Sequence, residues 1–238
     1  MTVEATPPVL AIDRSRPPER IELGDGSSWV DLTRGFVLEP NALLAELVDT
    51  VSWMQAGTWR YDHYVDERRL GAGIRHDQAP PALRQSRLHL DAAYRVRFGD
   101  AVAIRYRDGS DFQGRHSDRQ MKWLDDTLVA IVVIGTPRPF ELRPRGDWRD
   151  PEARADTTGE VRLQLGDGDL MVMGGRCQQD WLHGVPEAPG HTEPRISITW
   201  RWTRRSGRPD TNPGYLDGRS FSDRPNMAGY RMRPPSPG

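Results

Sequence analysis

The second half of the chain is a succession of short apolar or alternating segments separated by turn-like stretches, and this pattern most constrains the fold. Segments of this kind cover residues 101–107, 112–118, 127–135, 139–145, 161–165, 169–175, 181–185 and 195–202. The stretches between them include DGSD, GTPRP, GDGD and EAPGHTEP. Short strands at such regular intervals are typical of a jelly roll, also called a double-stranded β-helix.

Helices are expected before this array and not between its strands, which argues against alternating βαβ units. The pattern predicts a hairpin over residues 21–36 and helices over residues 40–54 and 80–98. We therefore expect an α+β fold that is mainly β, with the N-terminal helices packed on one side. The expected divisions are a flexible arm (1–20), a region of hairpin and helices (21–100), the double-stranded β-helix core (101–202) and an irregular Arg/Pro-rich tail (203–238).

Composition narrows the class of protein. The 23 Gly and 20 Pro of the 238 residues favour turn-rich β structure over a helical bundle. A net charge of −1 excludes a grossly basic nucleic-acid binder, although a local basic face stays open. Cys177 is the sole cysteine, and the chain shows neither a secretory signal nor an apolar run of about 20 residues. We expect a cytoplasmic monomer that makes no contact with membranes.

His116 and Asp118 stand two residues apart, so on a strand their side chains point to the same face. A third ligand is available in His183, on another predicted strand 65 positions after Asp118. Two His and one carboxylate form the ligand set of non-haem Fe(II) sites with open coordination positions. The alternative is a chance HxD pair, which occurs in many chains.

Arg195 and Arg201 share one face of the strand predicted over residues 195–202, together with positions 197 and 199. Two guanidinium groups facing a barrel interior require an anion, and the dicarboxylate 2-oxoglutarate would meet that need. The alternative is that one or both side chains point to solvent.

Residues 58–72 place Trp59, Tyr61 and Tyr64 among arginines. Aromatic rings interleaved with Arg are suited to stacking on bases and holding phosphates. The alternative is an ordinary amphipathic connector with buried aromatic residues.

Five motifs occur in a characteristic order, namely YRDGSD, HSD, GDLMVMGG, CQQDWLHGVP and PRISITWR. In this order and spacing they resemble the AlkB-like Fe(II)/2-oxoglutarate-dependent dioxygenases, and the resemblance covers roughly residues 20–202. It implies a jelly-roll core and an oxidoreductase that uses Fe(II), 2-oxoglutarate and O2.

The resemblance also implies roles for particular residues. It makes His116, Asp118 and His183 the catalytic iron ligands. Tyr106, Arg195 and Ser197 would contact 2-oxoglutarate, and Arg201 would bind its other end or take a supporting position. Residues 58–72 would form the nucleotide-recognition lid. The chain departs from the family pattern at Ile104 and Ser197, where the family often carries Asn. The residues that would contact substrate are Trp59, Tyr61, Tyr64 and Arg115.

The function implied is oxidative dealkylation of N-alkylated bases in DNA or RNA, a DNA-repair type of demethylation. It would convert O2 and 2-oxoglutarate to succinate, CO2 and formaldehyde. The alternative is a small-molecule hydroxylase or demethylase on the same scaffold, because a scaffold does not fix its substrate. A catalytically silent nucleic-acid-binding module is a third class, and the complete ligand triad disfavours it.

Overall fold

The computed structural model describes residues 11–60, 63–118, 121, 124, 126–146, 149–203 and 231–233. The strands are β1 (Glu19–Glu22), β2 (Ser28–Thr33), β3 (Met54–Arg60), β4 (His63–Ile74), β5 (Ala101–Tyr106), β6 (Gln113–His116), β7 (Thr127–Gly135), β8 (Arg138–Pro144), β9 (Val161–Leu165), β10 (Asp169–Gly175), β11 (Trp181–Val185), β12 (Arg195–Thr203) and β13 (Arg231–Arg233). The helices are α1 (Pro40–Thr50), a 3-10 turn η1 (His76–Gln78), α2 (Pro81–Tyr94), α3 (Pro151–Ala155) and α4 (Cys177–Asp180).

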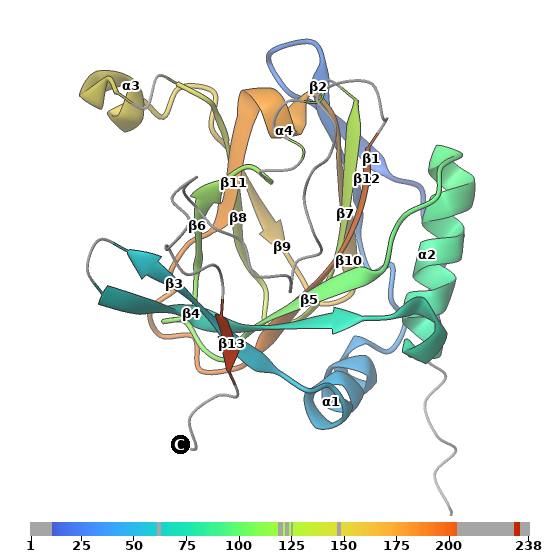
Figure 1. Cartoon of the computed structure of the whole chain (residues 1–238). Coiled ribbons are helices and arrows are strands. Elements are labelled where there is room, and N and C mark those ends of the chain that lie inside the picture. Colours follow the sequence, from blue (N-terminus) through green and yellow to red (C-terminus); the bar gives the residue numbers. More distant parts are fainter. Residues whose placement is uncertain are drawn as a thin grey trace, which may run out of the picture.

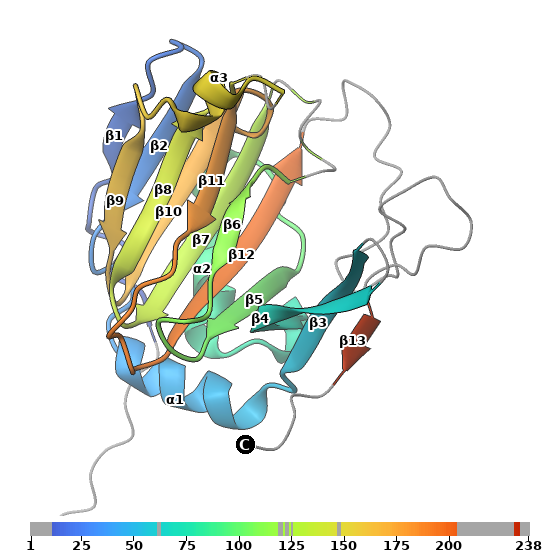
Figure 2. The same ribbon diagram turned by 90° about the vertical axis from the view of Figure 1, so that its left-hand side faces the viewer.

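Two sheets form a jelly-roll sandwich (Figure 1). The large sheet has nine strands in the order β1-β2-β10-β7-β12-β5-β4-β3-β13. The small sheet has four, in the order β6-β11-β8-β9, and lies over one face of the large sheet (Figure 2). All pairs between neighbouring strands are antiparallel, as the sequence pattern predicts.

Strand β7 lies near the middle of the large sheet, and its two faces serve two separate cores. Val129, Ile131 and Val133 pack toward the small sheet, with Phe140 and Leu142 of β8. The alternate residues of β7 pack on the opposite face, where α1 and α2 lie. A strand buried on both faces reads as a continuous apolar run, which explains the segment TLVAIVVIG.

The helices cover the large sheet on one side, as expected (Figure 1). Leu43 and Leu47 of α1 are buried against that sheet. Helix α1 ends at Thr50, earlier than predicted, because Val51 is extended and β3 begins at Met54. Helix α2 also ends before its predicted end at residue 98, because Arg95 adopts a left-handed conformation with φ 55°.

Each of the eight strands predicted between residues 101 and 202 is present, with end points shifted by two residues at most. The predicted hairpin over residues 21–36 is also confirmed as β1 and β2. The long hairpin of β3 and β4 was not predicted as strands, and neither were α3 and α4. The proposed boundary after residue 100 falls inside one sheet, because β4 pairs with β5.

The predicted terminal segments need correction. The flexible-arm prediction for residues 1–20 does not hold over its described part, because Ile12 is buried and forms a bridge with Val37. The tail was expected to be irregular, yet β13 pairs with β3 at the edge of the large sheet. The rest of the tail lies outside the described residues. Within the described ranges, no helix has the length and apolar character needed to cross a membrane.

Candidate metal and cosubstrate site

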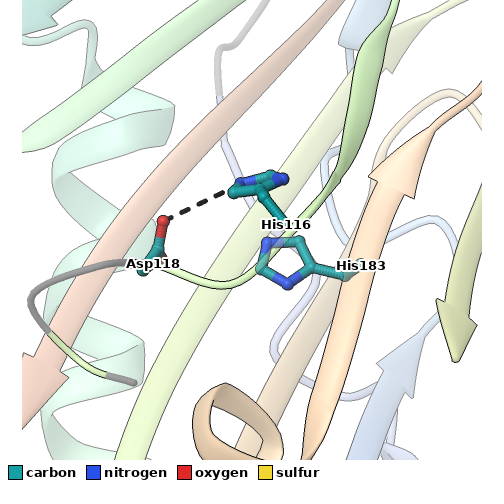
Figure 3. Close-up of side chains that lie close together, drawn as sticks. All are labelled: His116, Asp118 and His183. Carbon is teal, nitrogen blue, oxygen red and sulfur yellow. Dashed lines mark ion pairs between the residues drawn. The ribbon is translucent and has the colours of Figure 1, made fainter. Parts of the chain in front are cut away.

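The predicted triad comes together in the structure. His116 lies at the end of β6, Asp118 follows two residues later, and His183 lies on β11 beside β6 (Figure 3). One ligand atom from each of the three lies within 4.8 Å of the others. The pairing of β6 with β11 sets His116 directly opposite His183, with ring centroids 4.3 Å apart. Strand register therefore places both imidazoles on one face.

Asp118 is fixed from two other directions. The Nε of Arg201 on β12 donates to its Oδ2 at 2.7 Å, which links the large sheet to the triad. Its backbone N–H donates to the Oε1 of Gln178 on α4 at 2.8 Å. Arg201 therefore contacts a ligand residue, a supporting position that the sequence comparison had left open.

The electrostatics of the triad suit a divalent cation. Burial opposes ionisation of Asp118, but the guanidinium of Arg201 outweighs it and the pKa of the carboxyl lies well below its usual range. Burial, reinforced by His116, lowers the pKa of His183 to about 3. His116 is only partly buried, yet loss of solvent around its ring also lowers its pKa. Two neutral imidazoles and one carboxylate are the protonation states that bind a metal.

A second feature of the site is a buried arginine on β12, the strand that also carries Arg201. Arg195 is 0% exposed, and none of its three guanidinium nitrogens has a hydrogen-bond partner among the described residues. Its guanidinium carbon lies 5.4 Å from the ring centroid of Tyr106, the residue opposite it on β5. Burial lowers the pKa of Arg195 to about 10, so it remains charged at neutral pH. Such a cation fits the carboxylate of a bound 2-oxo diacid.

The remaining predicted cosubstrate residue, Ser197, lies between Arg195 and Arg201 on the same face of β12, directly opposite Ile104. Ile196, Ile198 and Trp200 point the other way, into the helix-side core. The alternation confirms that the two arginines share a face.

The predicted substrate residues have different positions. Arg115 lies on β6, where its neighbour His116 points to the opposite face, and it forms ion pairs with Glu141 and Glu160 at 2.9 and 3.2 Å. The structure therefore does not bring Arg115 to the triad.

The other three substrate residues belong to the β3–β4 hairpin. Trp59 and Tyr64 are paired directly across it. Tyr61 lies outside the described residues.

Three polar residues that support the site were missed from the sequence. Gln178 and Arg145 hold the HSD segment, since the Nη2 of Arg145 donates to Ser117 Oγ and its Nε to the Gln179 carbonyl. The third is Arg138, which donates to three backbone carbonyls. The sequence signal for Gln178 was its place in CQQDWLHGVP. Arg138 sits in GTPRP and was read as part of a turn.

Comparisons with known proteins agree with a site that holds a metal ion and a 2-oxo diacid. Residues 45–201 match the family model described as the 2OG-Fe(II) oxygenase superfamily, where 2OG stands for 2-oxoglutarate. The chain is 29% identical over 216 residues to the human protein named alpha-ketoglutarate-dependent dioxygenase alkB homolog 3, covering 84% of this chain and 74% of that one. It is 30% identical over 129 residues to the DNA oxidative demethylase ALKBH2 of Arabidopsis thaliana, covering 47% of this chain and 41% of that one.

A solved structure supports the same fold. The structure titled "The structure of OsALKBH1" superposes with a TM-score of 0.50 at 14% identity, covering 73% of this chain and 97% of that one. The family match spans both sheets and the residues of the triad. The chain therefore belongs to the 2OG-Fe(II) oxygenase superfamily as an AlkB-like dioxygenase that uses Fe(II), 2-oxoglutarate and O2.

Proposed function

We propose that this enzyme removes alkyl groups from the nitrogens of bases in DNA or RNA, acting as a cytoplasmic monomer. The observation that carries the proposal is the unpartnered cation of Arg195 on the face of β12 that also carries Arg201, which hydrogen-bonds Asp118 of the triad. The similarity to proteins named as DNA oxidative demethylases supports the choice of substrate class.

In this proposal the three residues of the triad hold Fe(II), which with 2-oxoglutarate and O2 supplies the oxidising power to hydroxylate a C–H bond. Arg201 keeps Asp118 ionised and oriented. Phe140 stacks on His183 with ring centroids 5.8 Å apart, and so covers that ligand with an apolar surface. In metal chemistry of this kind the protein orients the ligands and excludes water from the site.

Two arginines divide the work on the cosubstrate. Arg201 contacts the metal ligand Asp118, so it belongs to the end of the pocket where a 2-oxo acid would chelate iron. Arg195 lies beside Tyr106 and offers unpaired donors to the distal carboxylate. The Ile104 side chain cannot hydrogen-bond the cosubstrate. Ser197, which is paired with it across β5 and β12, is the polar side chain available at this position.

The substrate would enter beside the β3–β4 hairpin, which projects from the large sheet (Figure 2). Trp59 and Tyr64 are candidates to stack on a base that has left its helix. A methyl group that weakens base pairing lowers the cost of extrusion. Hydroxylation of an N-methyl group gives a product that releases formaldehyde and restores the base.

The decisive experiment incubates the Fe(II)-loaded enzyme, with 2-oxoglutarate in air, with oligonucleotides that carry 1-methyladenine or 3-methylcytosine. We expect restored bases and an equal amount of formaldehyde, in single-stranded and in duplex substrates tested side by side. Succinate release with another substrate, but no base restored in any oligonucleotide, would reject nucleobase dealkylation and retain the dioxygenase.

That outcome would favour the second candidate, a small-molecule hydroxylase or demethylase. The observation behind it is the net charge of −1, which gives the chain little general attraction for polyanions. A screen of metabolites for substrate-dependent succinate release would identify such an activity.

A further inference from the structure

Arg138, at the start of β8, is a second buried arginine near the cosubstrate pocket. It is 1% exposed. Its Nη1 donates to the carbonyl of Asp108 at 3.1 Å, and its Nη2 donates to those of Asp111 at 2.8 Å and Pro186 at 2.6 Å. The first two carbonyls precede β6 and the third follows β11. Arg138 is therefore held rigidly between the ends of the two strands that carry the histidines.

The guanidinium groups of Arg138 and Arg195 share one aromatic neighbour. Their guanidinium carbons lie 5.3 and 5.4 Å from the ring centroid of Tyr106. The Nε of Arg138 has no hydrogen-bond partner in the described part of the chain, and neither has any of the three nitrogens of Arg195. Four unsatisfied donors therefore gather around Tyr106, and such a cluster requires an acceptor.

The charges in this region are also unbalanced. Among the described residues, no carboxylate forms an ion pair with Arg138 or Arg195. The carboxylate of Asp111 approaches this region, but it is occupied by Arg107 at 2.8 Å. Burial lowers the pKa of both arginines, and Arg138 adds to the effect on Arg195, as two neighbouring buried cations must. A bound anion would relieve both.

We propose that Arg138 is a positioning residue of the cosubstrate site, whose fixed positive charge attracts the distal carboxylate that Arg195 hydrogen-bonds. The division of labour follows from the contacts. The Nη groups of Arg138 are committed to backbone carbonyls, whereas the donors of Arg195 are free for the ligand. This inference rests on the assignment of Arg195 in the proposed function.

The test separates the charge of Arg138 from its hydrogen bonds to the backbone. Arg138→Gln removes the charge and keeps an amide donor, and Arg138→Lys keeps the charge. The full-length protein loaded with Mn(II) is titrated with 2-oxoglutarate in a calorimeter, and Mn(II) affinity is measured separately. Arg195→Gln is the reference for a lost ligand contact, and Arg162→Gln, an exposed arginine on β9, is the matched control.

We expect Arg138→Gln to raise the Kd for 2-oxoglutarate about tenfold or more, and Arg138→Lys to stay within about threefold of the wild type. The Mn(II) Kd should stay within about twofold in both variants, and Arg162→Gln should match the wild type throughout. Should Arg138→Gln fail to fold, Arg138→Lys provides the test. A variant that keeps the positive charge must also keep its affinity for 2-oxoglutarate.

Three results would overturn the inference. If Arg138→Gln binds 2-oxoglutarate normally while Arg195→Gln does not, Arg138 has no role and the assignment of Arg195 stands. If neither variant loses affinity, the assignment of Arg195 fails as well. If the Gln and Lys variants lose affinity equally, or lose Mn(II) in parallel, Arg138 acts as a backbone staple and its charge is irrelevant.

Discussion

At the scale of single residues, the charges placed around Asp118 prepare the triad for a metal ion. Asp118 is buried, and a buried carboxylate is stable only when paired and hydrogen-bonded. Arg201 meets that condition before any metal arrives, because its Nε and Nη2 donate to the two carboxylate oxygens, and Gln178 holds the backbone N–H of Asp118. The site is therefore preorganised for a cation, with little rearrangement needed on binding.

Replacing His116 tests this preorganisation. We expect His116→Ala to abolish metal binding and turnover, because two ligands cannot hold the ion. The fold should survive, since the His116 side chain is 34% exposed and its loss leaves no sealed cavity. Metal titration and thermal unfolding provide the two measurements, with His76→Ala on η1 as the control. Turnover that persists in His116→Ala would refute the metal assignment.

Sequence reasoning identified His183 and Arg195 because their residue types carry specific chemistry and their strands were recognisable. It missed Arg138 for a physical reason. Arg138 stands between two prolines, a context that favours turns, and its role depends on carbonyls 27 to 48 positions away in the chain. The sequence around Arg138 carries no pattern that would reveal contacts with residues so far away in the chain.

At the scale of elements, the loop that leads into β6 is fitted closely against the loop that follows β11. The N–H of Gly109 donates to the carbonyl of His191 at 2.8 Å, and the N–H of Ala188 donates to the carbonyl of Gly109 at 2.9 Å. A Cβ added at Gly109 would lie 1.9 Å from the carbonyl oxygen of Ala188. Glycine is therefore required by the close approach of two backbones.

Gly109→Ala is expected to destabilise the protein by about 1–3 kcal/mol, because a backbone segment must move to admit the methyl group. Gly114→Ala is the matched control, since nothing lies within 4 Å of a Cβ at that position. Denaturant unfolding of both variants supplies the comparison. Equal stability of the two would mean that the loops separate easily.

The β3–β4 hairpin shows why some elements escape prediction. Its strands MQAGTWR and HYVDERRLGAGI contain charged residues and glycines, which are poor strand formers. They are strands because they pair with each other and because β4 adds to β5. By contrast, β7 was predicted from its continuous apolar run, because burial on both faces requires such residues.

At the scale of the whole molecule, the pocket joins the two sheets. His116 and His183 come from the small sheet, and Arg195 and Arg201 come from the large one. A metal and a cosubstrate bound together would contact both layers. Ligand binding should therefore stabilise the sandwich as a unit.

We expect Mn(II) and 2-oxoglutarate together to raise the Tm. At about one hundred times the Kd a ligand adds about 2.7 kcal/mol to the free energy of unfolding. For a chain of this size that corresponds to roughly 5–10 °C. The shift should vanish when a chelator removes the metal. An unchanged Tm with saturating ligands would contradict a site shared between the sheets.

The two faces of strand β12 link the stability of the fold to the cosubstrate site. Its odd-numbered residues line the pocket and its even-numbered residues build the helix-side core. A slip of one position would turn Arg195 toward the helix-side core and bring Ile196 to the face that carries the cosubstrate site. Any misregistered molecule would thus lose its core and its cosubstrate contact together. Only the stable register of β12 therefore also carries the cosubstrate contacts.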